Sequence, residues 1–268
     1  MERSKLKNIV ILLLVVLNAF FLILVVNQNQ RAKAFQEAGR EATISLLQEK
    51  GFSIEEEVVP WEQQLLGCTM ERNQEQEQQL ARLALGEIGP RTGGTTARYE
   101  SPQGSIQFFQ TGRFVMNLEE GAVSASGGAV EIHAAEYLQS LGMDTKFQSK
   151  EEIDANLVQV TVLQLVDKVP VFSSEIVLEY QDGALQTISG MRLADNLTPS
   201  GKASLGAETL LTNFLELILS GNVSCTEIRG ITPGYVHASE TALTPIWRIE
   251  TDTGIYELNC LTGKLHWL

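Results

Sequence analysis

The longest apolar run of the chain lies close to its first residues. Ile9 to Val26 form an 18-residue stretch in which Asn18 is the only strongly polar side chain, and no comparable run occurs elsewhere. At about 1.5 Å per residue, a helix of this length covers roughly 27 Å, close to the ~30 Å hydrocarbon thickness of a bilayer. The pattern therefore predicts one transmembrane helix over residues 9–26.

A cleaved signal peptide is the competing interpretation of this run. The segment Ala32-Lys33-Ala34 has the small-x-small form that signal peptidases accept. However, the apolar run is longer than the roughly 7–15 residues usual for a signal peptide, and the polar stretch from Asn27 to Lys33 is long for a cleavage region. We therefore expect an uncleaved membrane anchor.

The amide of Asn18 has two interpretations of equal weight. An amide in hydrocarbon gains from a hydrogen bond to a neighbouring helix, so Asn18 is a candidate for a helix–helix contact in the membrane. Because such bonds average only about 0.6 kcal/mol, the residue is equally well explained as a tolerated polar side chain.

Basic residues near the apolar run predict its orientation. Arg3, Lys5 and Lys7 precede the run, whereas Arg31 and Lys33 follow it. Lys and Arg are enriched on the cytoplasmic side of spanning helices. The excess favours a cytoplasmic N-terminus, with the bulk of the chain outside a cell membrane that it crosses once.

Beyond the membrane the pattern first indicates helices and then strands. The segment Arg31–Lys50 is rich in helix formers and ends at Gly51, which predicts a stalk. Phe52–Val59 is typical of a strand and Met70–Leu85 of a helix with a polar face. Between Gly86 and Gly128, short apolar runs separated by glycines favour a β-meander. The apolar positions of the stalk at helical spacing are Phe35, Ala38, Ala42, Leu46 and Leu47.

The last 140 or so residues contain an approximate duplication of a helix followed by strands. The first copy is predicted as a helix at Val130–Leu141 and strands at Leu157–Val166, Val171–Tyr180 and Ala184–Ser189. The second is predicted as a helix at Ala207–Leu219 and strands at Val223–Ile231, Pro245–Thr251, Gly254–Asn259 and Lys264–Leu268. Aligning Pro170-Val171-Phe172 with Pro245-Ile246-Trp247 relates the copies by an offset of 75.

These elements predict an α+β fold with mainly antiparallel sheets and helices packed on one face. The expected organisation is a cytoplasmic tail at 1–8, a transmembrane helix at 9–26, a helical stalk at 27–50, an N-terminal extracytoplasmic α+β region at 51–128 and a C-terminal α+β region with two repeats at 129–268.

The charge balance excludes one class of partner. The chain has 20 Lys plus Arg and 33 Asp plus Glu, and without the first 26 residues these become 17 and 32, a net charge of −15. A body this acidic repels phosphate backbones, so we expect no nucleic-acid partner.

Several segments resemble the YycI and YycH group of membrane-anchored regulators of Gram-positive bacteria. The similar segments are Ser4-Lys5-Leu6-Lys7-Asn8-Ile9, Leu17-Asn18-Ala19-Phe20-Phe21-Leu22, Leu163-Gln164, Val169-Pro170-Val171-Phe172, Gly234-Tyr235, Pro245-Ile246-Trp247-Arg248-Ile249, Tyr256-Glu257-Leu258-Asn259 and Thr262-Gly263. The last of them also resemble the closing hairpin of PepSY-type domains. The resemblance implies a non-enzymatic protein that adjusts the output of a sensor histidine kinase in two-component signalling. It also implies a paired YycH-like protein as a second partner.

Motifs for catalysis or metal binding are missing from the sequence. His133, His237 and His266 are scattered, with no H-E-x-x-H motif, and no G-x-S-x-G elbow occurs. We therefore expect no catalytic residue, no metal and no cofactor. Two alternatives stay open. One is a cell-wall hydrolase, whose two carboxylates need only converge in space, and the other is a PepSY-like module that inhibits a protease or binds a ligand.

The cysteines and tryptophans leave further alternatives. Cys225 and Cys260 could form a disulfide in an oxidising compartment, although three small semi-buried thiols explain the cysteines more simply, and Cys68 could be free. Trp247 is expected in the core, whereas Trp267 is a candidate interface residue.

Overall fold

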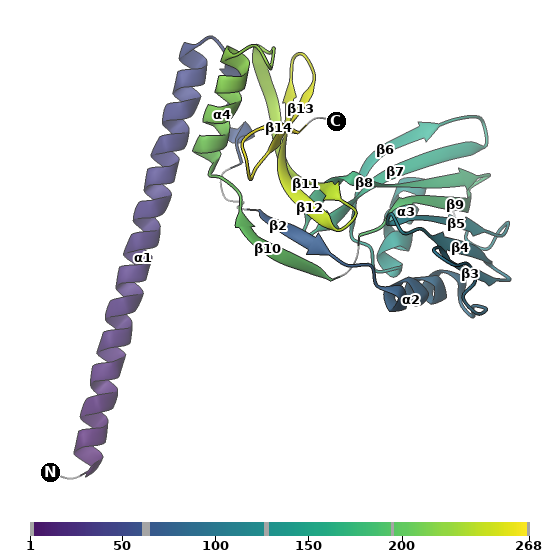
Figure 1. Ribbon diagram of the computed structural model, residues 1–268, viewed down its shortest axis with the longest axis horizontal. Coiled ribbons are helices and arrows are strands. Elements are labelled where there is room, and N and C mark those ends of the chain that lie inside the picture. The colour runs from purple at the N-terminus through teal and green to yellow at the C-terminus, as the bar shows by residue number, and fades with distance from the viewer. Residues whose placement is uncertain (1–2, 61–64, 126–128, 194–195, 267–268) are drawn as a thin grey trace.

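A computed structural model describes residues 3–60, 65–125, 129–193 and 196–266 of the chain (Figure 1). The fold is α+β, as predicted, with few helices and a large, mostly antiparallel sheet. The helices are α1 Arg3–Glu49, the 3-10 helix η1 Glu56–Val58, α2 Gln74–Leu85, α3 Val130–Ser140 and α4 Ala207–Leu219. The strands are β1 Ser53–Ile54, β2 Leu66–Met70, β3 Ala97–Ser101, β4 Gly104–Phe108, β5 Arg113–Leu118, β6 Thr145–Glu152, β7 Leu157–Val166, β8 Val169–Gln181, β9 Ala184–Met191, β10 Leu197–Ala203, β11 Glu227–Ser239, β12 Ala242–Thr251, β13 Ile255–Asn259 and β14 Leu265–His266.

The strands and helices gather into two lobes, which lie side by side in Figure 1. We call the lobe that α1 enters the proximal lobe; it contains the last turns of α1, α4, β1, β2 and β10–β14. The distal lobe contains α2, α3 and β3–β9. Strand β8 connects the lobes, because Val171 near its start pairs in parallel with Tyr235 of β11, while residues 176–181 of β8 lie between β7 and β9.

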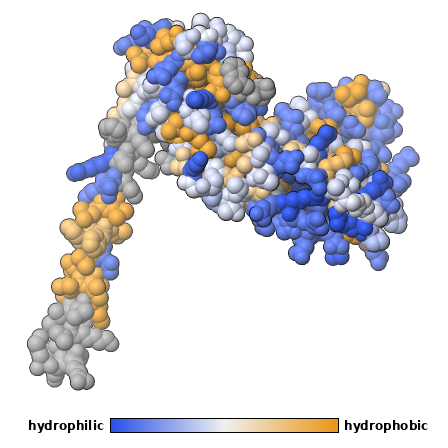
Figure 2. Space-filling view, in the orientation of Figure 1, coloured by the Kyte–Doolittle hydropathy of each residue, from blue (hydrophilic) through white to orange (hydrophobic). Residues whose placement is uncertain are grey.

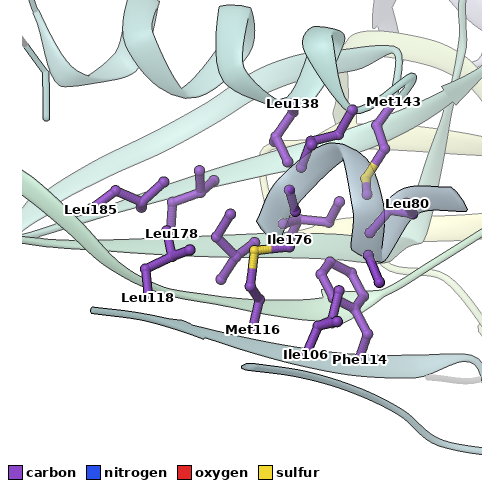
Figure 3. Packing of buried hydrophobic residues seen from close by; sticks show 14 of the residues in the cluster. Leu80, Ile106, Phe114, Met116, Leu118, Leu138, Met143, Ile176, Leu178 and Leu185 are labelled. Carbon is purple, nitrogen blue, oxygen red and sulfur yellow. The ribbon is translucent and has the colours of Figure 1, made fainter. Parts of the chain in front are cut away.

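In the distal lobe, α2 and α3 pack on one face of the sheet. Figure 3 shows Leu80 of α2 and Leu138 of α3 directed at Met116 and Ile176 of the strands. All four side chains are buried, and Leu138, Met116 and Ile176 are fully inaccessible. Buried positions alternate with more exposed ones along β4 and β5, as expected for strands that bury a single face.

In the proximal lobe, α4 and the end of α1 cover the sheet formed by β11, β12 and β13. Phe214 of α4 and Ile249 of β12 are fully buried in this core, together with Trp247. The predicted core position of Trp247 is therefore confirmed. Both lobes bury their helices by the same arrangement, a helix laid on the apolar face of a meander.

The duplication has a clearer form in the structure than in the sequence. Each copy is a helix followed by four strands joined as antiparallel neighbours, α3 with β6–β9 and α4 with β11–β14. The first copy was predicted with three strands, and β6 was missed because its residues, TKFQSKEE, are polar and exposed at the sheet edge. The sequence offset of 75 aligns β8 with β12. Because β8 is the third strand of the first copy and β12 is the second strand of the second copy, this offset does not align equivalent strands.

Other elements also differ from the sequence prediction. The strand expected at Phe52–Val59 is the two-residue β1 followed by η1, and the exposed edge strand β10 was not predicted at all. Strand β11 extends to Ser239 through Pro233 and Gly234, two residues that usually interrupt strands. A Cβ at Gly234 would overlap the ring of Phe172, so the close approach of β8 explains the glycine.

Strand pairing also crosses the boundary expected between residues 128 and 129. Strand β5, which precedes that boundary, pairs with β9, and β2 pairs with β12. Non-local pairs of this kind leave no mark on the local hydrophobic pattern, so the order of elements along the chain did not indicate them.

A carboxylate holds the start of β11 in place and makes stability depend on pH. Asp252 accepts hydrogen bonds from the hydroxyl of Thr226 at 2.7 Å and from the backbone N–H groups of Thr226 and Glu227 at 2.9 and 3.1 Å. These bonds, chiefly the one from the Thr226 hydroxyl, lower the pKa of Asp252 from 3.8 to about 2. A carboxyl with a depressed folded-state pKa stabilises the fold fully above its unfolded pKa and loses this effect as pH falls towards the folded value.

We expect the free energy of unfolding to fall between pH ~4 and pH ~2, and Asp252→Asn to remove part of that slope. Urea denaturation at a series of pH values measures both curves. Glu120→Gln, which neutralises an exposed carboxyl in the distal lobe, serves as the control. An unchanged slope in Asp252→Asn would contradict the assignment.

Candidate functional site

The predicted membrane segment and the stalk form one uninterrupted helix. Helix α1 runs from Arg3 to Glu49, which corresponds to about 70 Å, and it contains one span, Ile11–Gln28, long and apolar enough to cross a membrane. None of this span is buried against the rest of the described chain, and Figure 2 shows its apolar surface in orange. Asn18 lies within the span and is exposed. Trp267 lies outside the described residues.

The other end of α1 is built into the core of the proximal lobe. Arg40, Ile44 and Leu47, spaced at i, i+4 and i+7, are buried there, and Leu47 is completely inaccessible. Among the apolar stalk positions at helical spacing, Leu47 is in this core, whereas Ala38, Ala42 and Leu46 are exposed. The side chain of Phe35 is not among those described.

Close packing against α4 explains which stripe is buried. At Gly39 a Cβ would lie 3.6 Å from the Cβ of Glu208, so the two helices nearly touch at that level. Further along, Ile44 and Leu47 share a core with Leu211 and Phe214 of α4. The end of α1 is therefore packed directly on α4, in one core with the sheet beneath it.

A cavity of about 480 Å³ lies where the two lobes meet. Both lobes contribute to its wall. The lining residues are Cys68, Gln76, Gln79, Leu80, Leu83, Leu141, Gly142, Met143, Asp144, Gln164, Leu165, Val166, Asp167, Arg192, Leu193, Leu197 and Pro199. The volume falls within the roughly 300–1,000 Å³ typical of ligand sites. None of its lining residues belongs to α4 or β11–β14, the second copy of the duplication.

A buried glutamine fixes the chain segment that connects the lobes at this cavity. The amide nitrogen of Gln164 donates to the carbonyl of Met191 at 2.6 Å, and its amide oxygen accepts from the N–H of Leu193 at 2.9 Å. The hydroxyl of Ser174 also donates to the Met191 carbonyl, at 3.1 Å. In the sequence, the sign of this role is a polar residue between the apolar residues Leu163 and Leu165. In the structure Gln164 is buried, and a buried amide requires hydrogen-bond partners.

The rim of the cavity includes a strained turn. Asp167 and Lys168 join β7 to β8 with φ angles of 49° and 68°, both in the left-handed region. Two-residue hairpins of this type favour Asn-Gly, and a non-glycine residue in this region costs about 1 kcal/mol. Strain of this kind is often retained at functional sites, which makes the rim a candidate for a role beyond packing.

The histidines are placed separately in the fold. His133 lies 2.9 Å from the hydroxyl of Tyr180 in the distal lobe, and His237 lies 2.8 Å from the hydroxyl of Ser173. Burial lowers the pKa of both imidazoles. In the described part of the chain, no group of three metal-binding side chains comes together.

The three cysteines are buried and free, so Cys225 and Cys260 do not form the disulfide that was considered. Both belong to the core of the proximal lobe, where burial raises the pKa of Cys260 to about 12. Cys68 borders the cavity, and burial raises its pKa as well. Thiols in this state are inert, which fits the interpretation of all three as packing residues.

In comparisons with known proteins, neither a protein-family model nor a curated protein sequence matches this chain.

Proposed function

We propose that this protein is a single-pass membrane protein that regulates a sensor histidine kinase through protein–protein contact, with its two lobes outside the cytoplasm. The observation that carries the proposal is the continuity of α1. One end of the helix exposes an apolar span to lipid or to other helices, and the other end is buried beside α4. A partner in the membrane and the outer lobes could therefore influence each other through a single rigid element.

Three further points support this proposal. The excess of basic residues before the apolar span favours a cytoplasmic N-terminus. The exposed amide of Asn18 offers a hydrogen bond to a partner helix. The resemblance of several segments to YycI and YycH proteins implies a histidine kinase and a YycH-like protein as the partners.

The test is recovery of partners from membranes with the tagged full-length chain. We compare the wild type with Asn18→Leu and with a chain in which residues 9–26 are replaced by leucines, which keeps the lobes anchored. Because an interhelical hydrogen bond averages about 0.6 kcal/mol, Asn18→Leu should reduce kinase recovery about threefold, and the leucine helix should reduce it further. Val16→Leu, roughly 200° around the helix from Asn18, should leave recovery unchanged.

Two results would count against the proposal. One is a set of recovered partners without a histidine kinase, and the other is equal kinase recovery with the leucine helix.

The cell-wall hydrolase alternative would rely on Asp144 and Asp167, the two carboxylates that line the cavity. Digestion of peptidoglycan by the full-length chain, abolished in Asp144→Asn, would favour that alternative.

A further inference from the structure

We propose that the cavity between the lobes binds a short peptide that has apolar side chains and one positively charged group. This inference goes beyond the regulatory function and does not depend on the identity of the membrane partner. It rests on the size of the cavity, on its apolar wall and on the kind of polar groups that remain available in it.

Apolar residues from both lobes form part of the wall. Leu80 and Leu83 of α2 face it together with Leu141 and Met143, which follow α3, while Leu197 of β10 contributes from the proximal lobe. Leu83 is 55% exposed, although its neighbour Leu80 is buried. An exposed leucine at a concave surface gains free energy when an apolar group covers it.

The polar groups of the lining include hydrogen-bond acceptors and one exposed amide. Gln79 is exposed at the cavity, and its side chain can both donate and accept. The carboxylates of Asp144 and Asp167 also line the cavity, and both residues are exposed. Arg192 is the one cationic residue of the lining, and it already interacts within the chain. The amide of Gln164 is occupied by Met191 and Leu193.

The side chains that line the cavity indicate the chemical class of the ligand. A positive charge would be attracted by Asp144 and Asp167, whereas an acidic ligand would be repelled by both. The carboxylates would accept hydrogen bonds from N–H donors of the ligand. A short peptide supplies backbone N–H groups, apolar side chains and a lysine or arginine in one molecule.

The probe is acetyl-Leu-Lys-Leu-amide, titrated calorimetrically into the full-length protein in lipid nanodiscs. The matched peptide acetyl-Leu-Glu-Leu-amide has the same length and apolar side chains but the opposite charge. We expect the lysine peptide to bind with a Kd below about 1 mM and the glutamate peptide to bind at least tenfold more weakly. Higher salt should weaken binding of the lysine peptide and reduce the difference in Kd between the two peptides.

Variants locate the binding to the cavity. Asp144→Asn combined with Asp167→Asn should weaken the lysine peptide about tenfold or more, and asparagine tolerates the positive φ at position 167. Glu119→Gln combined with Glu120→Gln makes the same change in net charge at exposed distal positions and should leave the Kd unchanged. Leu83→Trp, at an exposed position of the wall, should block binding without disturbing the core.

The proposal is overturned if neither peptide binds below about 1 mM, if both bind equally, or if Leu83→Trp leaves the Kd unchanged while its thermal unfolding matches that of the wild type. No histidine kinase takes part in these titrations, so their failure would leave the regulatory proposal standing. Conversely, failure to recover a histidine kinase from membranes would not contradict the proposed peptide site.

Discussion

Replacing Arg248 with alanine is expected to lower the free energy of unfolding by about 3–5 kcal/mol, because it leaves the carboxylate of Glu257 buried without its partner. The side chain of Glu257 is 1% exposed and that of Arg248 is 22% exposed. Two guanidinium nitrogens of Arg248, Nη2 and Nε, donate to the same carboxylate oxygen, Oε1, at 2.7 and 3.2 Å. Chemical denaturation of the full-length protein in detergent measures the change.

The surroundings of the pair explain why the effect should be large. The guanidinium of Arg248 also lies 3.7 Å from the ring centre of Phe172, a cation–π contact that would be lost. The other carboxylate oxygen of Glu257, Oε2, is buried and has no hydrogen-bond partner in the described structure. Since Phe172 belongs to β8 and Arg248 to β12, the variant also removes a contact at the junction of the lobes.

A second substitution tests this explanation. The double variant Arg248→Met, Glu257→Leu removes both charges, and replacing a buried ion pair with apolar residues is often neutral or stabilising. It should therefore be more stable than Arg248→Ala by at least about 2 kcal/mol. If the two variants lose the same stability, the cost does not come from the unpaired carboxylate and the explanation is wrong.

Replacing Leu47 with alanine is expected to destabilise the proximal lobe by about 2–5 kcal/mol, the usual cost of such a truncation in a packed core. Leu47 is completely buried between α1 and α4, next to a core that contains Trp247. Urea denaturation followed by tryptophan fluorescence should detect the change.

The adjacent residue provides a matched control. Leu46 is 41% exposed on the same helix, so Leu46→Ala makes the same chemical change where little area is buried and should cost less than about 0.5 kcal/mol. Equal losses in the two variants would show that helix propensity, and not the packing of α1 on α4, determines the result. If Leu47→Ala also reduces recovery of the kinase while the protein stays folded, the connection through α1 would gain direct support.

Local patterns determined the parts of this protein that depend on nearest neighbours. An 18-residue apolar run needs no partner to specify a helix, because every backbone group of a helix is bonded within the segment. The α3 and α4 helices were predicted within a residue or two for a related reason, since their apolar positions recur at the helical period. Gly183 and Gly263 adopt positive φ in the turns that follow Asp182 and Thr262, and glycine is the residue type that such turns favour.

Tertiary contacts decided the rest. The face of α1 that becomes buried is determined by its packing against α4, which lies some 160 residues later in the chain, and the apolar spacing of the stalk did not specify that face. Strand β6 has no apolar alternation, so its pairing with β7 is the main cause of its strand conformation.

The cavity also could not be predicted from the sequence. Its wall combines residues that lie between Cys68 and Pro199 in the sequence. The role of Gln164 depends on its hydrogen bonds to Met191 and Leu193, which are some 30 residues away in the chain. Backbone hydrogen bonds and the hydrophobic period act over a few residues and so can be read along the chain. A site between two lobes depends on which distant surfaces meet, and that is determined only when the whole chain minimises its exposed apolar area and unpaired polar groups together.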